Sequence, residues 1–113
     1  MTLNAIQNVI YQIVSTLADG EYTMVVRECY KSRLQAGDLA KAISDYGKTI
    51  VKPPSNFVEY LDCVAVRGRA DPTWSVRAPL WTLEEGRSDL TLELTVTETE
   101  RRTLIEIDDL RVT

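Results

Sequence analysis

Carboxylates are the main side chains here that could carry out acid–base chemistry, because the 113 residues include no histidine. Without histidine, the Ser-His-Asp and Cys-His arrangements of hydrolases and histidine-ligated zinc are excluded. Glu93 and Glu106 fall on consecutive expected strands, where they could be neighbours. Paired acids catalyse hydrolysis when one of them lies in a dry pocket. On an open sheet face both would be ionised, so the sequence predicts no enzyme and no catalytic residue.

The other reactive groups do not indicate a metal or cofactor site. Glu84, Glu85 and Asp89 form an acidic group, but their spacing fits no known loop for Mg²⁺ or Ca²⁺. A turn whose side chains bind strand-end amides is the better interpretation of this segment. Cys29 and Cys63 lie far apart in apolar surroundings, and we expect reduced core thiols rather than a disulfide.

Charge is unevenly distributed along the chain, whose formal net charge is −4. Residues 1–80 are close to neutral, whereas residues 81–113 hold four arginines and nine acidic residues. An acidic surface is a poor match for phosphate backbones, and no basic stripe is interleaved with aromatic residues, so we expect no nucleic-acid partner. It is a good match for a basic protein, although it could also be a plain solvated surface.

The most regular part of the sequence is residues 74–96, WSVRAPLWTLEEGRSDLTLELTV. Leucine or valine alternates with polar residues along its second half, which predicts a strand with one buried face. We expect four antiparallel strands at residues 60–67, 74–83, 89–98 and 103–112. Pro79 indicates an edge or a bulge, and a bulge at Asp108-Asp109 would bring the apolar residues of the last strand into phase. The first strand is apolar on both faces, which favours a central position.

The residues before the strands have helical spacing. Apolar residues recur every three or four positions in residues 4–19 and 38–46, and residues 22–31 fit a short helix with a strand as the alternative. Pro53-Pro54 marks the change from helices to strands. We predict one α+β domain over residues 1–113, with a helical part (1–47) and a sheet part (57–113). Two to three helices would pack on one face of a four-stranded antiparallel meander.

Candidate binding residues fall on the other face of this sheet and on its acidic turn. If Trp74 points into the core, Trp81 shares the surface side with Arg77, and Trp and Arg dominate interface energetics. The alternative is that Pro79 shifts the phase and places Trp81 in the core. The predicted partner-binding residues are Trp81, Glu84, Glu85, Glu93, Asp108 and Asp109. For the last two, a bulge with solvated charge is the competing interpretation.

Two resemblances follow from these residues. The PLWTxEEGxSDLTLELTV core (residues 79–96), with IEIDDL (105–110) and AISDYG (42–47), resembles a family of small, functionally uncharacterised bacterial proteins. That family implies no catalytic residues. By general character rather than motif, the chain is also similar to immunity proteins of bacterial toxin delivery systems, including contact-dependent inhibition, which bind and block a toxin domain. The order of helices and strands is similar to cystatin-like and NTF2-like shapes.

Our leading hypothesis is a cytoplasmic immunity protein that binds a basic toxin domain. No apolar run approaches the roughly 20 residues of a membrane span, and the first residues lack a secretory leader, so we expect no membrane partner. One alternative is an NTF2-like small-molecule module with a pocket lined by Tyr22, Tyr46, Tyr60 and Trp74. Another is a structural homodimer formed through the open sheet face.

Overall fold

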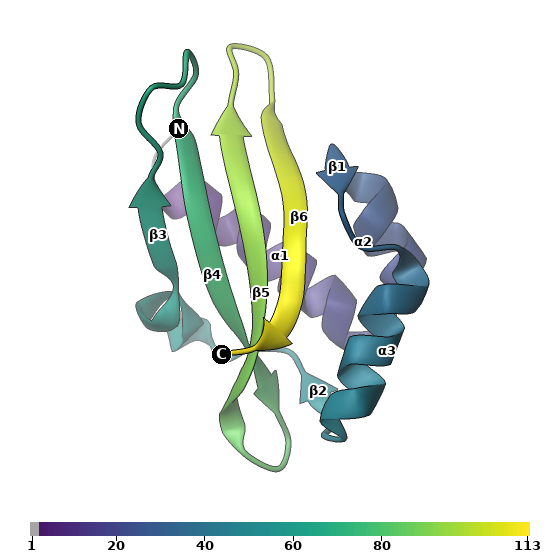
Figure 1. Ribbon diagram of the computed structural model, residues 1–113. Coiled ribbons are helices and arrows are strands. Elements are labelled where there is room, and N and C mark those ends of the chain that lie inside the picture. Colours follow the sequence, from purple (N-terminus) through teal and green to yellow (C-terminus); the bar gives the residue numbers. More distant parts are fainter. Residues whose placement is uncertain (1–2) are drawn as a thin grey trace.

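The computed structural model describes residues 3–113, which form helices and one curled sheet (Figure 1). Within this range the chain is α+β, as predicted. In chain order the elements are α1 (Leu3–Ala18), α2 (Tyr22–Glu28), β1 (Lys31–Ser32), α3 (Ala36–Tyr46), β2 (Ile50–Val51), the 3₁₀ helix η1 (Ser55–Tyr60), β3 (Asp62–Ala65), β4 (Thr73–Thr82), β5 (Gly86–Glu98) and β6 (Thr103–Val112).

The long strands form an antiparallel meander in which β3, β4, β5 and β6 each pair with the next. The predicted meander is therefore present, but the complete sheet has six strands and is mixed. Two-residue strands extend it, since β1 pairs in parallel with β6 and β2 pairs with the end of β4. Pairs this short leave no alternating pattern in a sequence, which is why the prediction missed them. The curled sheet forms a half-barrel.

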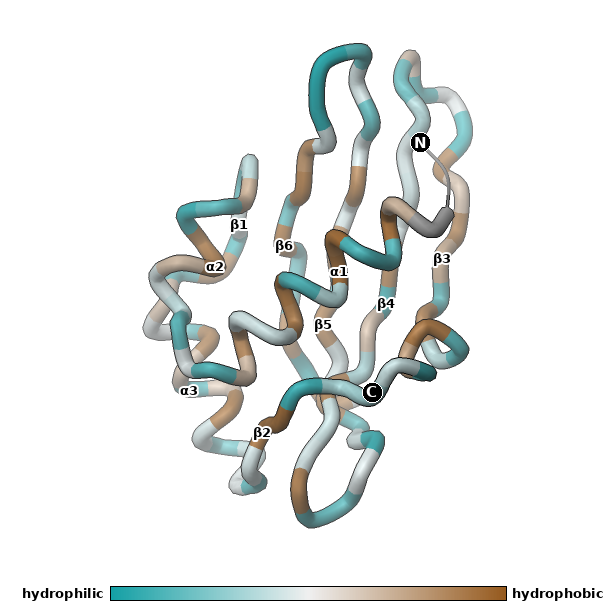
Figure 2. The backbone as a smooth tube through the Cα atoms, turned by 180° about the vertical axis from the view of Figure 1, so that it is seen from behind, coloured by the Kyte–Doolittle hydropathy of each residue, from teal (hydrophilic) through white to brown (hydrophobic). Residues whose placement is uncertain are grey.

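One helix covers one face of the sheet. In Figure 2, which views the molecule from the back of Figure 1, α1 crosses in front of the strands. Its apolar stripe packs against the alternating residues of β4, β5 and β6, and side chains on both sides are buried. The fully buried members, each less than 2 % exposed, include Ile6, Ile10, Val14, Leu17, Val76, Leu92, Leu94 and Ile107.

The other two α-helices, α2 and α3, lie beside the β6 side of the sheet rather than across its face (Figure 1). The α2 segment is helical, so the strand alternative for its residues is wrong. Two residues separate the end of α2 from the start of β1. Backbone N–H groups of Tyr30 and Arg33 donate to the carbonyls of Ile105 and Ile107 at 2.8 and 2.9 Å. These bonds fix the helical part of the chain to β6.

The expected central position of the first strand is wrong. β3 has only four residues and lies at the edge, paired with β4 on one side. Cys63 packs against the core, but Ala65 is exposed and Val64 is 55 % exposed. Apolar residues on both sides of a strand are typical of a buried position, and here only one side is covered.

Both predicted bulges are present. The register between β4 and β5 shifts between Pro79 and Trp81, so Pro79 marks a bulge within the sheet rather than an edge. In the β5–β6 pair, Leu94 faces Ile107 and Glu93 faces Asp109, which leaves Asp108 as the extra residue. The shift buries Leu110 with Ile105 and Ile107, whereas Val112 remains 61 % exposed near the end of the chain.

None of the helices in residues 3–113 combines the length and the apolar character needed to cross a membrane.

Packing between α1 and the sheet predicts the effect of a truncation at its centre. Leu92 is 0 % exposed, so Leu92→Ala should lower the free energy of unfolding by about 2–5 kcal/mol, since it removes buried apolar surface and leaves a cavity. Urea unfolding followed by circular dichroism measures this change. The comparison variant is Val64→Ala on exposed β3, for which we expect a loss of less than about 1 kcal/mol. Equal losses in the two variants would contradict the described core.

Candidate functional site

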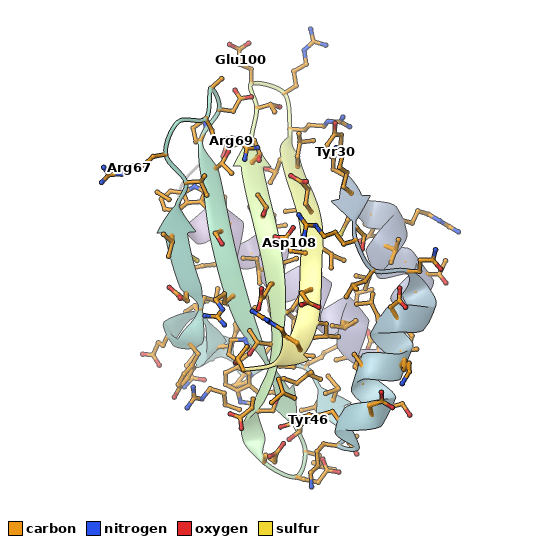
Figure 3. All side chains as sticks on the ribbon, in the orientation of Figure 1. Tyr30, Tyr46, Arg67, Arg69, Glu100 and Asp108 are labelled. Atoms are coloured by element: carbon orange, nitrogen blue, oxygen red, sulfur yellow. The ribbon has the colours of Figure 1, made fainter. Side chains whose placement is uncertain are left out.

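The face of the sheet opposite α1 carries most of the candidate residues, and we call it the open face. Strand alternation puts leucines and valines toward α1 and leaves the intervening polar residues on this side. The figures show no helix over it (Figures 1 and 3). Its members come from β3, β4, β5 and β6: Asp62, Arg77, Pro79, Thr91, Glu93, Thr95, Glu106, Asp108, Asp109 and Arg111.

A charged row runs across the open face. Asp62 faces Arg77, Arg77 faces Glu93, and Glu93 faces Asp109 in the register of β3 to β6. Side chains opposite each other on one face of an antiparallel sheet are direct neighbours. Four consecutive strands therefore place one cation and three carboxylates side by side, although each residue lies about 15 positions from the next in the sequence.

Glu93 is the centre of the ion pairs in this row. Its Oε2 atom accepts a hydrogen bond from Arg111 Nε at 2.8 Å and lies 3.9 Å from a guanidinium nitrogen of Arg77. The hydrogen bond to Glu93 and its charge raise the pKa of Arg111. The Glu93 side chain is 21 % exposed, and both arginines are more open. Two cations thus compensate its negative charge, so Glu93 organises the open face rather than adding free charge to it.

The bulge in β6 presents two adjacent carboxylates on the same face. Asp108 Oδ2 accepts a hydrogen bond from the Thr95 hydroxyl at 2.7 Å, and Figure 3 shows Asp108 over the middle of the sheet. Asp109 lies 3.7 Å from Arg111 Nε. Within residues 3–113 no cation forms an ion pair with Asp108 or Glu106, although Lys31 faces Glu106 across the β1–β6 pair. These two acids therefore have no direct ion pair in the described residues, although Lys31 and Arg33 line the same hollow.

Trp81 is the second-last residue of β4, at one end of the open face, and is half-buried. Its ring packs edge-on against Tyr60, with ring centres 5.4 Å apart, and it also packs against the core. The Arg87 guanidinium lies 5.0 Å from the Tyr60 ring centre, which is the range of a cation–π contact. Trp81 is thus neither fully in the core nor a free surface anchor. The exposed members of this cluster are Tyr60 and Arg87.

A shallow hollow of about 400 Å³ joins this aromatic cluster to the charged row. Backbone bulges in β4 and β5 bend the strands here, and short side chains such as Pro79 and Thr91 form the floor. Charged residues of both signs line the walls. The lining residues are Tyr60, Asp62, Arg77, Pro79, Arg87, Ser88, Asp89, Thr91 and Thr113.

Glu84 and Glu85 lie apart from this face, at the tip of the β4–β5 hairpin, where they bind other parts of the chain. The backbone N–H and the hydroxyl of Thr49 donate to the Glu84 carboxylate at 2.8 and 2.9 Å. The Tyr46 hydroxyl donates to Glu85 Oε1 at 2.8 Å and accepts from the backbone N–H of Asp89 at 3.3 Å. These contacts attach the hairpin to the end of α3, and Figure 3 shows Tyr46 beside it.

The contacts at the hairpin shift the pKa values of Glu84 and Tyr46. The Thr49 backbone N–H is the main cause that lowers the pKa of Glu84. Burial acts in the opposite direction, and the Thr49 hydroxyl and the charge of Lys48 lower the pKa further. Burial, followed by the hydrogen bond to Glu85, raises the pKa of Tyr46. The Glu84 carboxylate therefore stabilises the fold in its ionised form.

The structure thus separates the six predicted binding residues. Glu93, Asp108 and Asp109 meet on the open face, Trp81 lies at its end, and the hairpin acids belong to an internal contact. The sequence analysis missed Asp62, Arg87 and Arg111, and it named Tyr60 only as part of the alternative ligand pocket. Their positions depend on the pairing of β3 with β4 and on the bulge in β6, and local patterning does not give cross-strand neighbours.

The thiols are poorly suited to nucleophilic chemistry. Burial, followed by the charge of Glu28, raises the pKa of Cys29 to about 11, and burial also raises the pKa of Cys63. Protonated thiols are weak nucleophiles and weak metal ligands. In the part of the chain that the structure describes, no three His, Cys, Asp or Glu side chains are grouped to hold a metal ion.

The four aromatic residues of the predicted ligand pocket do not converge. Tyr46 and Tyr60 line different hollows, and fully buried side chains of α1 and β5 fill the space between the helix and the sheet. Trp74 packs on the edge of the core. This arrangement gives the small-molecule alternative no support.

A family model described as a domain of unknown function (DUF7668) matches residues 14–113, which include every residue of the open face. Neither a curated protein nor a solved structure matches the chain.

The hairpin contact predicts a pH-dependent stability effect. Since folding lowers the pKa of Glu84, its stabilising contribution is present at neutral pH and is lost as the pH falls through the lowered folded-state value. Glu84→Gln should therefore reduce the urea midpoint at pH 7, and the difference from the parent should disappear in acid. Glu100→Gln, on the exposed β5–β6 loop, is the control and should leave the midpoint unchanged. A pH-independent loss in Glu84→Gln would show that its charge is not involved.

Proposed function

The chain belongs to the DUF7668 family, and from that premise we propose that it is a protein-binding module that binds a basic partner through the open face. The observation that carries this proposal is the set of carboxylates fixed on an uncovered sheet, of which Glu106 and Asp108 have no ion-pair partner in the described residues. Carboxylates that are not tied up in ion pairs attract and orient a partner of opposite charge.

The rigidity of the open face supports this proposal. The acids of the open face project from long paired strands, and Asp108 is further held by the Thr95 hydroxyl. Groups that are already ordered lose little conformational entropy when a partner binds. The half-buried Trp81 and the exposed Tyr60 at the end of this face add aromatic surface of the kind that contributes most to interfaces.

We further propose that the biological form of this binding is immunity. In this account the chain occludes a basic toxin domain: Glu106, Asp108 and Asp109 pair with its lysines and arginines, while Tyr60 fills a small pocket. Glu84 and Glu85 act indirectly, because they hold the hairpin that supports Trp81. The protein would act in the cytoplasm, where such a toxin arrives, and no chemical step is required.

The test compares charge-neutral variants of two surfaces. The protein is used as bait in a lysate of its own strain, and a recovered protein is purified for kinetic measurements. Glu106→Gln, Asp108→Asn and Asp109→Asn, combined in one variant, remove three charges from the open face and preserve side-chain shape. At low salt we expect association to slow by about tenfold or more, because electrostatic steering is lost.

The matched control combines Glu21→Gln, Glu28→Gln and Glu59→Gln, three exposed acids outside the open face. It should associate at the parental rate. Equal rates for all three proteins, or recovery of acidic partners only, would contradict the open-face proposal. Co-expression tests the immunity proposal separately from binding. The recovered protein should arrest growth, and co-expression of the parent should restore it. A recovered partner that is not toxic would overturn the immunity proposal but not the binding proposal.

A further inference from the structure

The surface of α1 that faces away from the sheet carries no charge. None of the 16 residues of this helix is Asp, Glu, Lys or Arg, whereas 27 % of the whole chain is charged. The other two α-helices are ordinary in this respect, with Arg27 and Glu28 in α2 and Asp38, Lys41 and Asp45 in α3. A surface helix normally presents charged residues to water, so α1 differs from its neighbours.

Amides take the place of charges on this helix. Asn8 and Gln12 are exposed, and Gln7 is half-buried beside them. Their side-chain amides have no hydrogen-bond partner within residues 3–113. The same helix crosses the front of the molecule in Figure 2, with nothing in front of its middle turns. Free donors and acceptors are therefore available along its outer side.

A groove lies beside these amides, between α1 and η1. It has a volume of about 590 Å³, and none of its lining residues is charged: Gln7, Asn8, Tyr11, Gln12, Ser55, Phe57 and Val58. Tyr11 and Phe57 meet edge-on at its base, with ring centres 5.3 Å apart. Depletion of charge together with an accessible tyrosine is the composition of interface cores rather than of solvated surfaces.

We propose that this uncharged face of α1, together with the groove beside it, binds a second copy of the same chain. A carboxamide both donates and accepts, so Asn8 and Gln12 can pair with their own copies across a two-fold axis, which like charges could not do. No charge on α1 or in the groove has to be desolvated. A partner with a strongly charged surface finds no complementary charge here, which makes an identical uncharged face the best match.

Size limits the strength of this contact. A 16-residue helix is about 24 Å long, and α1 alone is too small for the roughly 800 Å² per partner of a stable interface. The groove must therefore contribute, with the residues of η1 that line it, and Glu59 of η1 lies outside that lining. We expect a reversible dimer. Dimerisation through this face leaves both open faces free, so the proposal is independent of the partner-binding function and would make the module bivalent.

Sedimentation velocity of the full chain, from low to high micromolar concentration, tests this proposal. The weight-average mass of the parent should rise toward twice the monomer mass. A variant that combines Asn8→Arg and Gln12→Arg places like charges at the contact, and arginine is a good helix former, so it should stay folded and monomeric.

The matched control adds the same two charges to the other helices, as Thr23→Arg with Ser44→Arg, both at exposed positions. It should dimerise like the parent. Circular dichroism melts of all three proteins establish that they are folded. A parent that remains monomeric throughout, or an Asn8→Arg, Gln12→Arg variant that dimerises like the parent, would overturn the proposal.

Discussion

The structure depends on the burial of one face of a curled sheet by a single helix. α1 supplies an apolar stripe that is matched by the inward residues of β4, β5 and β6, and this contact forms most of the core. Hydrophobic burial is the dominant favourable term in folding, so the remaining elements are arranged around this contact. With one such helix available, the other sheet face must remain in water, and its polar residues follow from that constraint.

The same constraint makes the open face suitable for binding. Its charged residues are carried by strands whose opposite side is fixed in the core, so their spacing is set by the ladder and not by flexible loops. Glu93 uses its charge within the face by pairing with Arg77 and Arg111. The bulge at Asp108 then adds a carboxylate that forms no direct ion pair in the described part of the chain. A rigid surface with residual negative charge is the physical basis for the proposed basic partner.

The sequence predicted what periodicity encodes and missed what depends on pairing between distant segments. Alternating residues located β4, β5 and β6 and even the bulge at Asp108, because a phase change is visible within one strand. It did not place β3 at the edge, because apolar composition does not distinguish a buried strand from a short uncovered one. For the acids of the hairpin, the sequence predicted a turn that binds strand-end amides and also partner binding by Glu84 and Glu85. Only the fold shows that Tyr46 and Thr49 bind these two acids.

Carboxyl footprinting tests the central claim, that the open face contacts a partner. The protein is labelled with a carbodiimide and an amine, alone and in complex with a captured partner, and each acid is quantified by mass spectrometry. We predict that Glu106, Asp108 and Asp109 react in the free protein and are protected in the complex, while Glu21 and Glu59 react equally in both. Protection confined to acids outside the open face would contradict this account.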